Sequence, residues 1–352
     1  MLTIPCRRGT IPPVIARSEI ETAVAELGAA PYRARQVYQA LTQGLAVGFE
    51  EMTVLPRALR VALAVRLTPR TLEPVEHWRS PTGDTEKTLF ATRDGHGVEA
   101  VLLRYPRRAT VCVSSQVGCA VGCPFCSSGR LGFARQLTAE EMMDQVLHWA
   151  RLLRPEGRRV TNVVFMGMGE PLLNTDETLR ACGLINDPEG FALAARAISI
   201  STVGVVPGIE RLGREAPQVN LAVSLHAATD DLRDRLVPLN RRCGLDAVFG
   251  ACARHVRATR RKLFFEWVVL PGVNDGDEQV AAAAARLRRP LYHLNLIPFN
   301  EAGGGFRAPV RDEVESLRRR FVAAGLRCTV RRSPGGEIEA ACGQLALRRL
   351  GR

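Results

Sequence analysis

The chain has 352 residues, of which 46% are hydrophobic and 24% are charged, as is ordinary for a globular protein. No apolar run reaches the roughly 18 residues that a membrane span needs, and the first residues lack the order of a signal peptide, so we expect a cytoplasmic protein without a membrane anchor. The net charge of +12 indicates a polyanionic partner. Nearly all of the basic residues are arginine, which suits phosphate binding, although a GC-rich genome that replaces lysine by arginine would explain this preference equally well.

Residues 1 to about 80 have a helical pattern. Ser18 is a candidate N-cap for a first helix, which Gly28 and Pro31 would end. Residues 32–41 then place apolar side chains at helical spacing on one side and arginines on the other. We therefore expect a small helical unit over residues 1–80, either a plain bundle or an accessory domain that grips a phosphate backbone.

Residues 81–109 read as an extended, β-rich connector, and a repeated strand-then-helix pattern begins at residue 110. The expected strands are 110–115, 160–166, 197–203, 219–225, 263–270 and 292–297. The expected helices are 138–151, which opens with a capping-box pattern, and 176–185, 230–236, 245–258 and 278–288. A last helix (310–324) and strand (327–332) precede the C-terminal segment.

Six such units predict an α/β fold with a parallel sheet, either an open doubly wound sheet or a barrel. In both folds the chemistry lies at the carboxyl ends of the strands. A loop with three cysteines follows the first strand at that end, and the segment 167–171 follows the second in the same way. The active site is therefore expected where these two loops meet.

The three cysteines are Cys119, Cys123 and Cys126, in the spacing Cys-x3-Cys-x2-Cys. A structural zinc site needs four protein ligands, and iron–sulfur clusters usually take four cysteines. A compact triad therefore suggests a cluster with one iron left open for chemistry. Ten cysteines in a cytoplasmic protein are not expected to form structural disulfides, and five of them read as core residues or bystanders: Cys6, Cys182, Cys243, Cys252 and Cys328.

The triad at this place resembles the radical S-adenosylmethionine (SAM) superfamily. Further motifs narrow the resemblance to the RlmN/Cfr family of RNA adenine methyltransferases: Cys112-Val-Ser-Ser-Gln-Val-Gly-Cys119, Phe165-Met-Gly-Met-Gly-Glu-Pro171, Ser224-Leu-His226, Asn295-Leu-Ile-Pro298 and Ala340-Ala-Cys-Gly-Gln-Leu345. The resemblance runs from about residue 30 to 346. It implies a partial (β/α)6 radical SAM barrel over residues 110–346, with an RNA-binding accessory domain at residues 1–80.

The resemblance also assigns the cofactor residues. It implies a [4Fe–4S] cluster on Cys119, Cys123 and Cys126, and two SAM molecules per turnover. Gly169 and Glu170 would hold the SAM amino group, because a carboxylate suits an ammonium ion. The rest of the SAM site would come from Ser201, Ser224, Leu225, His226 and Asn300.

Two further cysteines carry the reaction that the resemblance implies. Cys342 would be methylated by a first SAM and would pass its methyl carbon, as a radical, to the ring of adenine. Cys112 would then resolve the protein–RNA adduct through a transient disulfide with Cys342, and Glu99 falls where the family has its proton acceptor. This route suits C2 of adenine, which is not nucleophilic and cannot attack the methyl group of SAM directly.

The resulting hypothesis is methylation of C2 of an adenosine in 23S rRNA, with tRNA left open as a second substrate. The motifs are equally compatible with Cfr-like methylation at C8, and a zinc-dependent RNA-binding protein without catalysis is the alternative of another class. We expect a monomer that takes electrons from a donor such as flavodoxin or ferredoxin. Pro334 departs from the family pattern before Cys342.

Overall fold

The computed structural model describes residues 17–301, 303–331 and 334–347. Ten strands form one sheet in the order β1-β2-β3-β4-β7-β8-β9-β10-β11-β12, and β5 pairs with β6 in a separate hairpin. The strands are β1 (Leu72–Arg79), β2 (Thr85–Thr92), β3 (Gly97–Tyr105), β4 (Arg108–Val113), β5 (Gln116–Gly118), β6 (Phe133–Gln136), β7 (Asn162–Phe165), β8 (Ile198–Thr202), β9 (Asn220–Ser224), β10 (Leu263–Val269), β11 (Tyr292–Pro298) and β12 (Cys328–Val330).

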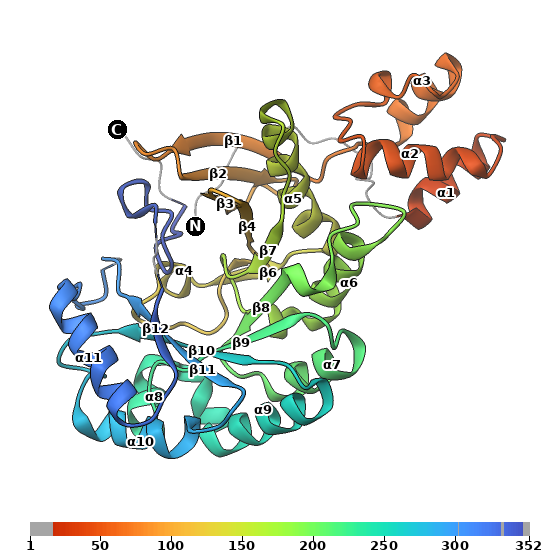
Figure 1. The fold of residues 1–352 in the computed structure, drawn as a ribbon. Coiled ribbons are helices and arrows are strands. Elements are labelled where there is room, and N and C mark those ends of the chain that lie inside the picture. The colour runs from red at the N-terminus through yellow and green to blue at the C-terminus, as the bar shows by residue number, and fades with distance from the viewer. Residues whose placement is uncertain (1–16, 302, 332–333, 348–352) are drawn as a thin grey trace.

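The α-helices lie between and around these strands (Figure 1). They are α1 (Arg17–Glu26), α2 (Tyr32–Thr42), α3 (Arg57–Arg66), α4 (Ser127–Arg130), α5 (Ala139–Leu153), α6 (Thr175–Asn186), α7 (Val206–Glu215), α8 (Asp230–Leu236), α9 (Leu245–Thr259), α10 (Asp277–Leu287) and α11 (Arg311–Ala323). Short 3-10 helices are η1 (Phe49–Glu51), η2 (Arg154–Glu156), η3 (Pro171–Asn174), η4 (Ala195–Ala197), η5 (Pro238–Arg242) and η6 (Gly336–Ile338). No helix in the described ranges is both long and apolar enough to cross a membrane.

In the main sheet, β4 and the strands β7 to β12 are parallel and alternate with helices that cover their outer face (Figure 1). The sheet does not close, because β1 and β12 lie at opposite edges, so the barrel is incomplete. This confirms the expected partial (β/α)6 barrel. Buried aliphatic side chains and two large aromatic residues, Trp149 and Trp267, fill the space between the sheet and its helices.

The N-terminal helices form a unit with its own hydrophobic core, which includes Ile20, Tyr38 and Leu63. The expected helical range is too long, because α3 ends at Arg66 and β1 begins at Leu72. The expected N-cap at Ser18 is also wrong, since Ser18 lies inside α1.

The expected connector is part of the main sheet. Strands β1, β2 and β3 pair antiparallel and extend the sheet beyond β4, so residues 81–109 are a structural arm of the barrel. Side chains such as Phe90 face the core under α5, whereas Leu89 and Val101 face the C-terminal segment with Ile338 and Leu345. Both faces of this arm are therefore covered, and one of them supports the segment that carries Cys342.

Candidate active site

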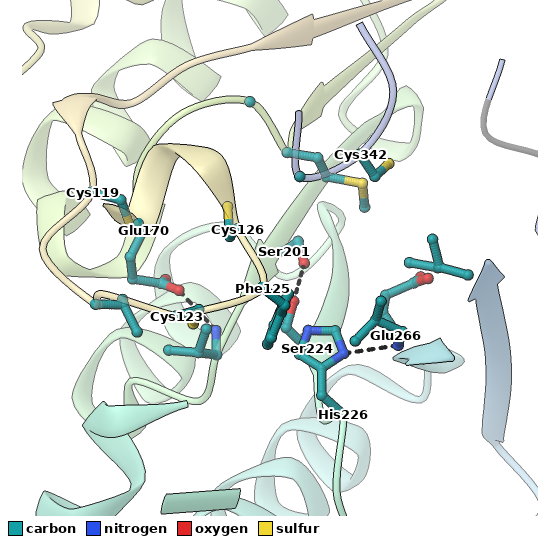
Figure 2. A pocket seen from close by; sticks show the side chains of 18 of the residues that line it. Cys119, Cys123, Phe125, Cys126, Glu170, Ser201, Ser224, His226, Glu266 and Cys342 are labelled. Atoms are coloured by element: carbon teal, nitrogen blue, oxygen red, sulfur yellow. Dashed lines mark hydrogen bonds between the residues drawn. The ribbon is translucent and has the colours of Figure 1, made fainter. Parts of the chain in front are cut away.

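The three motif cysteines surround one end of a cavity at the carboxyl ends of the strands (Figure 2). Cys119 follows β5, and Cys126 immediately precedes α4, so the β5–β6 hairpin and α4 hold the two ends of the loop. The backbone N–H of Cys119 donates to Gly132 O at 2.9 Å, and that of Cys126 donates to Cys123 O at 3.1 Å. The loop is thus fixed by its backbone, which leaves the sulfur atoms available.

The spacing of the cysteines distinguishes between kinds of metal site. Within the described ranges, no group of three or more His, Cys, Asp or Glu side chains could hold one metal ion. Thiolates that bind a cluster each take a different iron atom and are held further apart than the ligands of one ion. Cys119, Cys123 and Cys126, which line one cavity together, supply the thiolate donors that iron–sulfur clusters take.

Burial acts on the same thiols. It raises the pKa of the Cys119 thiol to about 12 and raises that of Cys123 well above its ordinary value. Thiolates at such positions need a compensating positive charge, which iron supplies on binding.

The cavity has a volume of about 170 Å³. Gly169 and Glu170 lie on its wall, in the loop after β7. Gly169 has φ +98°, and a Cβ atom there would lie 2.5 Å from the Cβ of Gln116, so only glycine fits. The Glu170 carboxylate accepts hydrogen bonds from Leu172 N (2.9 Å) and Val203 N (2.7 Å).

Ser201, Ser224 and His226 line the cavity from the ends of β8 and β9 (Figure 2). The two serine hydroxyls lie 3.2 Å apart. His226 has φ +60°, and its Nδ1 accepts a hydrogen bond from Val268 N at 3.0 Å. Burial, with help from the positive charge of Arg233, lowers the pKa of His226 to about 3, so this ring is neutral and carries its proton on Nε2.

Two residues that were expected to bind SAM do not present their side chains to the cavity. The Leu225 side chain is fully buried in the core, so only its backbone is available to a ligand. Asn300 is absent from the lining of the cavity, and its Nδ2 donates to Cys342 O at 3.4 Å. Asn300 therefore supports the C-terminal segment in this structure.

Cys342 lies between two cavities, which share a wall. It lines the first cavity together with Cys119, Cys123 and Cys126 (Figure 2). It also lines a second, smaller cavity together with Cys112 of β4. The segment is fastened to the cluster loop, because Ser127 N donates to Gly343 O at 2.8 Å and Ser128 Oγ donates to Leu345 O at 2.7 Å. The structure thus brings Cys342, Cys112 and the cluster triad together.

Cys112 and Cys342 are both free thiols. Burial raises the pKa of Cys112 to about 12, and the nearby Cys342 sulfur adds to the rise, whereas Arg331 opposes it. Arg331 lines both cavities, so a guanidinium accompanies the two cysteines.

Glu99 lies apart from this group. It is fully buried, lines neither cavity, and forms an ion pair with Lys87 (Nζ–Oε1 3.1 Å). Its second oxygen accepts a hydrogen bond from Leu347 N at 3.3 Å. The structure therefore connects Glu99 to Leu347, a residue that follows Cys342 in the C-terminal segment.

Sequence reasoning missed two charged residues of the site. Glu266 is buried in β10 and lines the cavity, and its Oε2 lies 3.7 Å from Nη1 of Arg331. The signal for Glu266 was available, since it interrupts the apolar run Leu263–Val269. Nothing in the sequence singled out Arg331 among the many arginines of the chain.

Three comparisons with known proteins agree with this geometry. Residues 113–284 match the Radical SAM superfamily. The chain is 42% identical to a probable dual-specificity RNA methyltransferase RlmN of Moorella thermoacetica, with 96% of each chain covered, and 43% identical to the protein of that name from Thermobifida fusca, with 98% of each covered. A radical SAM methyltransferase from Sphaerobacter thermophilus has a similar structure, with a TM-score of 0.91, 47% identity, and coverage of 94% of this chain and 98% of that one.

Proposed function

Because the chain belongs to the RlmN family of radical SAM methyltransferases, which use a [4Fe–4S] cluster and SAM, we propose that it methylates C2 of an adenosine in 23S rRNA and also acts on tRNA. The observation that carries the proposal is the position of Cys342, which faces the cluster cysteines in one cavity and Cys112 in the next. A thiol that carries the methyl group needs access both to the cluster cavity and to Cys112.

Cys119, Cys123 and Cys126 would hold the cluster, and Gly169, Glu170, Ser201, Ser224 and His226 would hold SAM. When bound, these groups supply methyl transfer and radical hydrogen abstraction. Leu225 would contribute only its backbone to SAM, and Asn300 would do so only after it releases Cys342 O.

Cys342 would carry the methyl carbon as a thioether, because a thiolate is the nucleophile that an ordinary methyl transfer needs. Release then falls to Cys112. Its thiolate attacks the Cys342 sulfur, a disulfide forms, and the bond between sulfur and the methylene carbon breaks with its electron pair on that carbon. The carbon takes a proton to become the methyl group, and an external thiol reduces the disulfide.

Glu99 remains our proposed proton acceptor, but only in a state in which its pair with Lys87 has opened. The electron donor would be an acidic protein such as flavodoxin or ferredoxin, which the net charge of +12 would attract. We expect a monomer that works in the cytoplasm, where its RNA substrates are.

Mass spectrometry of nucleosides tests this function. Deproteinised rRNA and tRNA are treated with the anaerobically reconstituted enzyme and methyl-labelled SAM, and the product should be 2-methyladenosine. The appearance of 8-methyladenosine in its place would overturn the C2 assignment and support the Cfr-like alternative.

Two variants test the roles of the cysteines in the same assay. C342A should abolish methylation, because no carrier sulfur remains. C112A should trap a protein–RNA adduct that survives denaturation, because nothing attacks the Cys342 sulfur. Buried Cys182 is the matched control, and C182A should methylate RNA at the wild-type level. Labelled product from C342A would exclude the carrier mechanism.

A further inference from the structure

A buried arginine without a charged partner lies behind the cluster cavity. Arg233 of α8 is 1% exposed. Its guanidinium donates only to oxygens of neutral groups: Leu225 O (3.0 Å), Ser224 O (3.1 Å), Val203 O and Asn240 Oδ1 (2.6 Å). Hydrogen bonds satisfy its N–H groups, but none of these partners carries a negative charge.

No carboxylate within residues 17–301, 303–331 and 334–347 forms an ion pair with Arg233. An uncompensated charge in a protein interior costs several kcal/mol, so buried charges are normally paired. Burial lowers the pKa of Arg233 to about 10, which still leaves the group protonated at neutral pH. The positive charge therefore persists. No carboxylate among the described residues contacts it directly, and Asp230 and Asp234 are reached only through the Asn240 amide.

Cys123 and Asp230 are the groups that most oppose the lowering of the Arg233 pKa by burial. Arg233 in turn opposes the rise that burial causes in the pKa of Cys123 and of Glu170.

The backbone contacts of Arg233 point to the same place. It holds the carbonyl groups of Val203 and Ser224, and both of these residues line the cavity with Cys123. The cation therefore lies immediately behind the wall that separates it from the cluster site.

We propose that Arg233 is the buried counter-charge of the iron–sulfur cluster and that it raises the reduction potential of that cluster. The reduced cluster carries one more negative charge than the oxidised cluster, so a fixed positive charge nearby stabilises the reduced form more. In a poorly solvated interior this effect is only weakly screened. Arg233 would act through the cluster and would not touch the reacting atoms, so it is a positioning residue. The inference rests on the cluster of the proposed function, but not on the identity of the methylated base.

A redox titration followed by the electron paramagnetic resonance signal of the reduced cluster tests the inference. It is done without SAM or RNA, with dithionite as the reductant. R233Q removes the charge and keeps a donor, and it should lower the ratio of reduced to oxidised cluster about tenfold at a given potential, which is 59 mV for one electron. R233K keeps the charge and should have a midpoint close to that of the wild type.

Arg235 provides a matched control, because it lies on the same helix but is exposed. R235Q should leave the midpoint unchanged. An unchanged midpoint in R233Q would overturn the proposal. An equal fall in R233Q and R233K would overturn it as well, because it would show that the fork geometry of arginine, and not its charge, supports the site.

Loss of the cluster would also be informative. If R233Q no longer retains iron, the iron content of R233K distinguishes the two explanations. Iron retained in R233K supports a role for the positive charge. Iron lost from both variants shows that Arg233 supports the fold of the site, and this result overturns the proposal. Failure of the proposed function is a separate result. A wild-type protein that binds no cluster would exclude the function, whereas a brown, iron-loaded R233Q with the wild-type midpoint would exclude only the inference.

Discussion

Glu170 shows how burial and hydrogen bonding oppose each other at one carboxylate. The side chain is 3% exposed, and burial raises its pKa from 4.5 to about 7, although two backbone N–H groups and Arg233 favour the charged form. A bound ammonium group would reverse this shift, because an opposite charge within contact distance favours ionisation. The free site is thus prepared for a cationic ligand.

The raised pKa of Glu170 predicts how the stability of the cluster-free protein depends on pH. The folded state keeps a proton that the unfolded state loses above pH 4.5, so stability should fall as pH rises from about 4.5 to about 7, by about 3 kcal/mol at most. Urea unfolding across this range measures the slope. E170Q should flatten it, whereas D176N, at an exposed position, should keep the wild-type slope. A steep slope that persists in E170Q would contradict the assignment.

The C-terminal segment around Cys342 is fixed at both ends by one buried ion pair. Lys87 of β2 donates to Glu339 O at 3.3 Å, and its partner Glu99 of β3 accepts from Leu347 N at 3.3 Å. Lys87 also lies over the ring of Trp78, with Nζ 4.8 Å from the centroid. The arm of the sheet therefore holds the residues on either side of Cys342.

Breaking this pair should destabilise the protein and loosen the segment. K87M leaves Glu99 buried without a counter-charge, which should cost about 3–5 kcal/mol, as measured by urea unfolding. The double variant K87M/E99Q should recover most of that loss, because no lone charge remains. The rate at which a thiol reagent modifies Cys342 should rise in K87M and fall back in the double variant. Equal destabilisation of the two variants would show that the pair does not act through its charge.

The element boundaries show what the sequence can specify. The run of residues in β10, Leu263–Val269, was predicted as 263–270, because a continuous apolar strand needs no tertiary information. Helix α7 was missed, since Pro207 and Gly208 near its start are helix-breaking residues. Its glycine is required by packing: a Cβ atom on Gly208 would lie 2.6 Å from the Cβ of Leu172. That close approach exists only in the folded protein.

The residues of the site likewise differ in whether the sequence alone could predict them. The Cys-x3-Cys-x2-Cys spacing, together with the family resemblance, predicted Cys119, Cys123 and Cys126 as cluster ligands, because cluster chemistry constrains the spacing of its ligands. Arg233, Glu266 and Arg331 could not be singled out, since arginine is abundant in this chain and the role of each residue depends on which strands become neighbours. The position of Glu99 also depended on tertiary structure, because its partner Lys87 lies on the adjacent strand.

At the scale of the whole molecule, the helical unit α1–α3 stands beside the barrel next to α6 (Figure 1). Tyr38 Oη donates to Asp187 Oδ2 at 2.9 Å just after α6, so the unit is attached to the barrel by a specific contact. Its surface carries exposed arginines, among them Arg35 and Arg57. We propose that this unit contacts the RNA backbone while the barrel handles the target base, because a base must leave its stack to reach a recessed site.

The salt dependence of RNA binding tests whether the helical unit contacts the RNA backbone. The variant R35Q/R57Q should bind rRNA fragments more weakly at all sequences, and the slope of log affinity against log salt should fall by about 1 for each phosphate contact removed. The reduction potential of the cluster should not change, because neither arginine lies at the cavity. R211Q on α7 is the matched control. Arg211 pairs with Glu215 as Arg35 pairs with Glu189, but it lies outside the helical unit, so the slope should not change. If R35Q/R57Q retains the wild-type slope, RNA docks elsewhere, and the helical unit has a purely structural role.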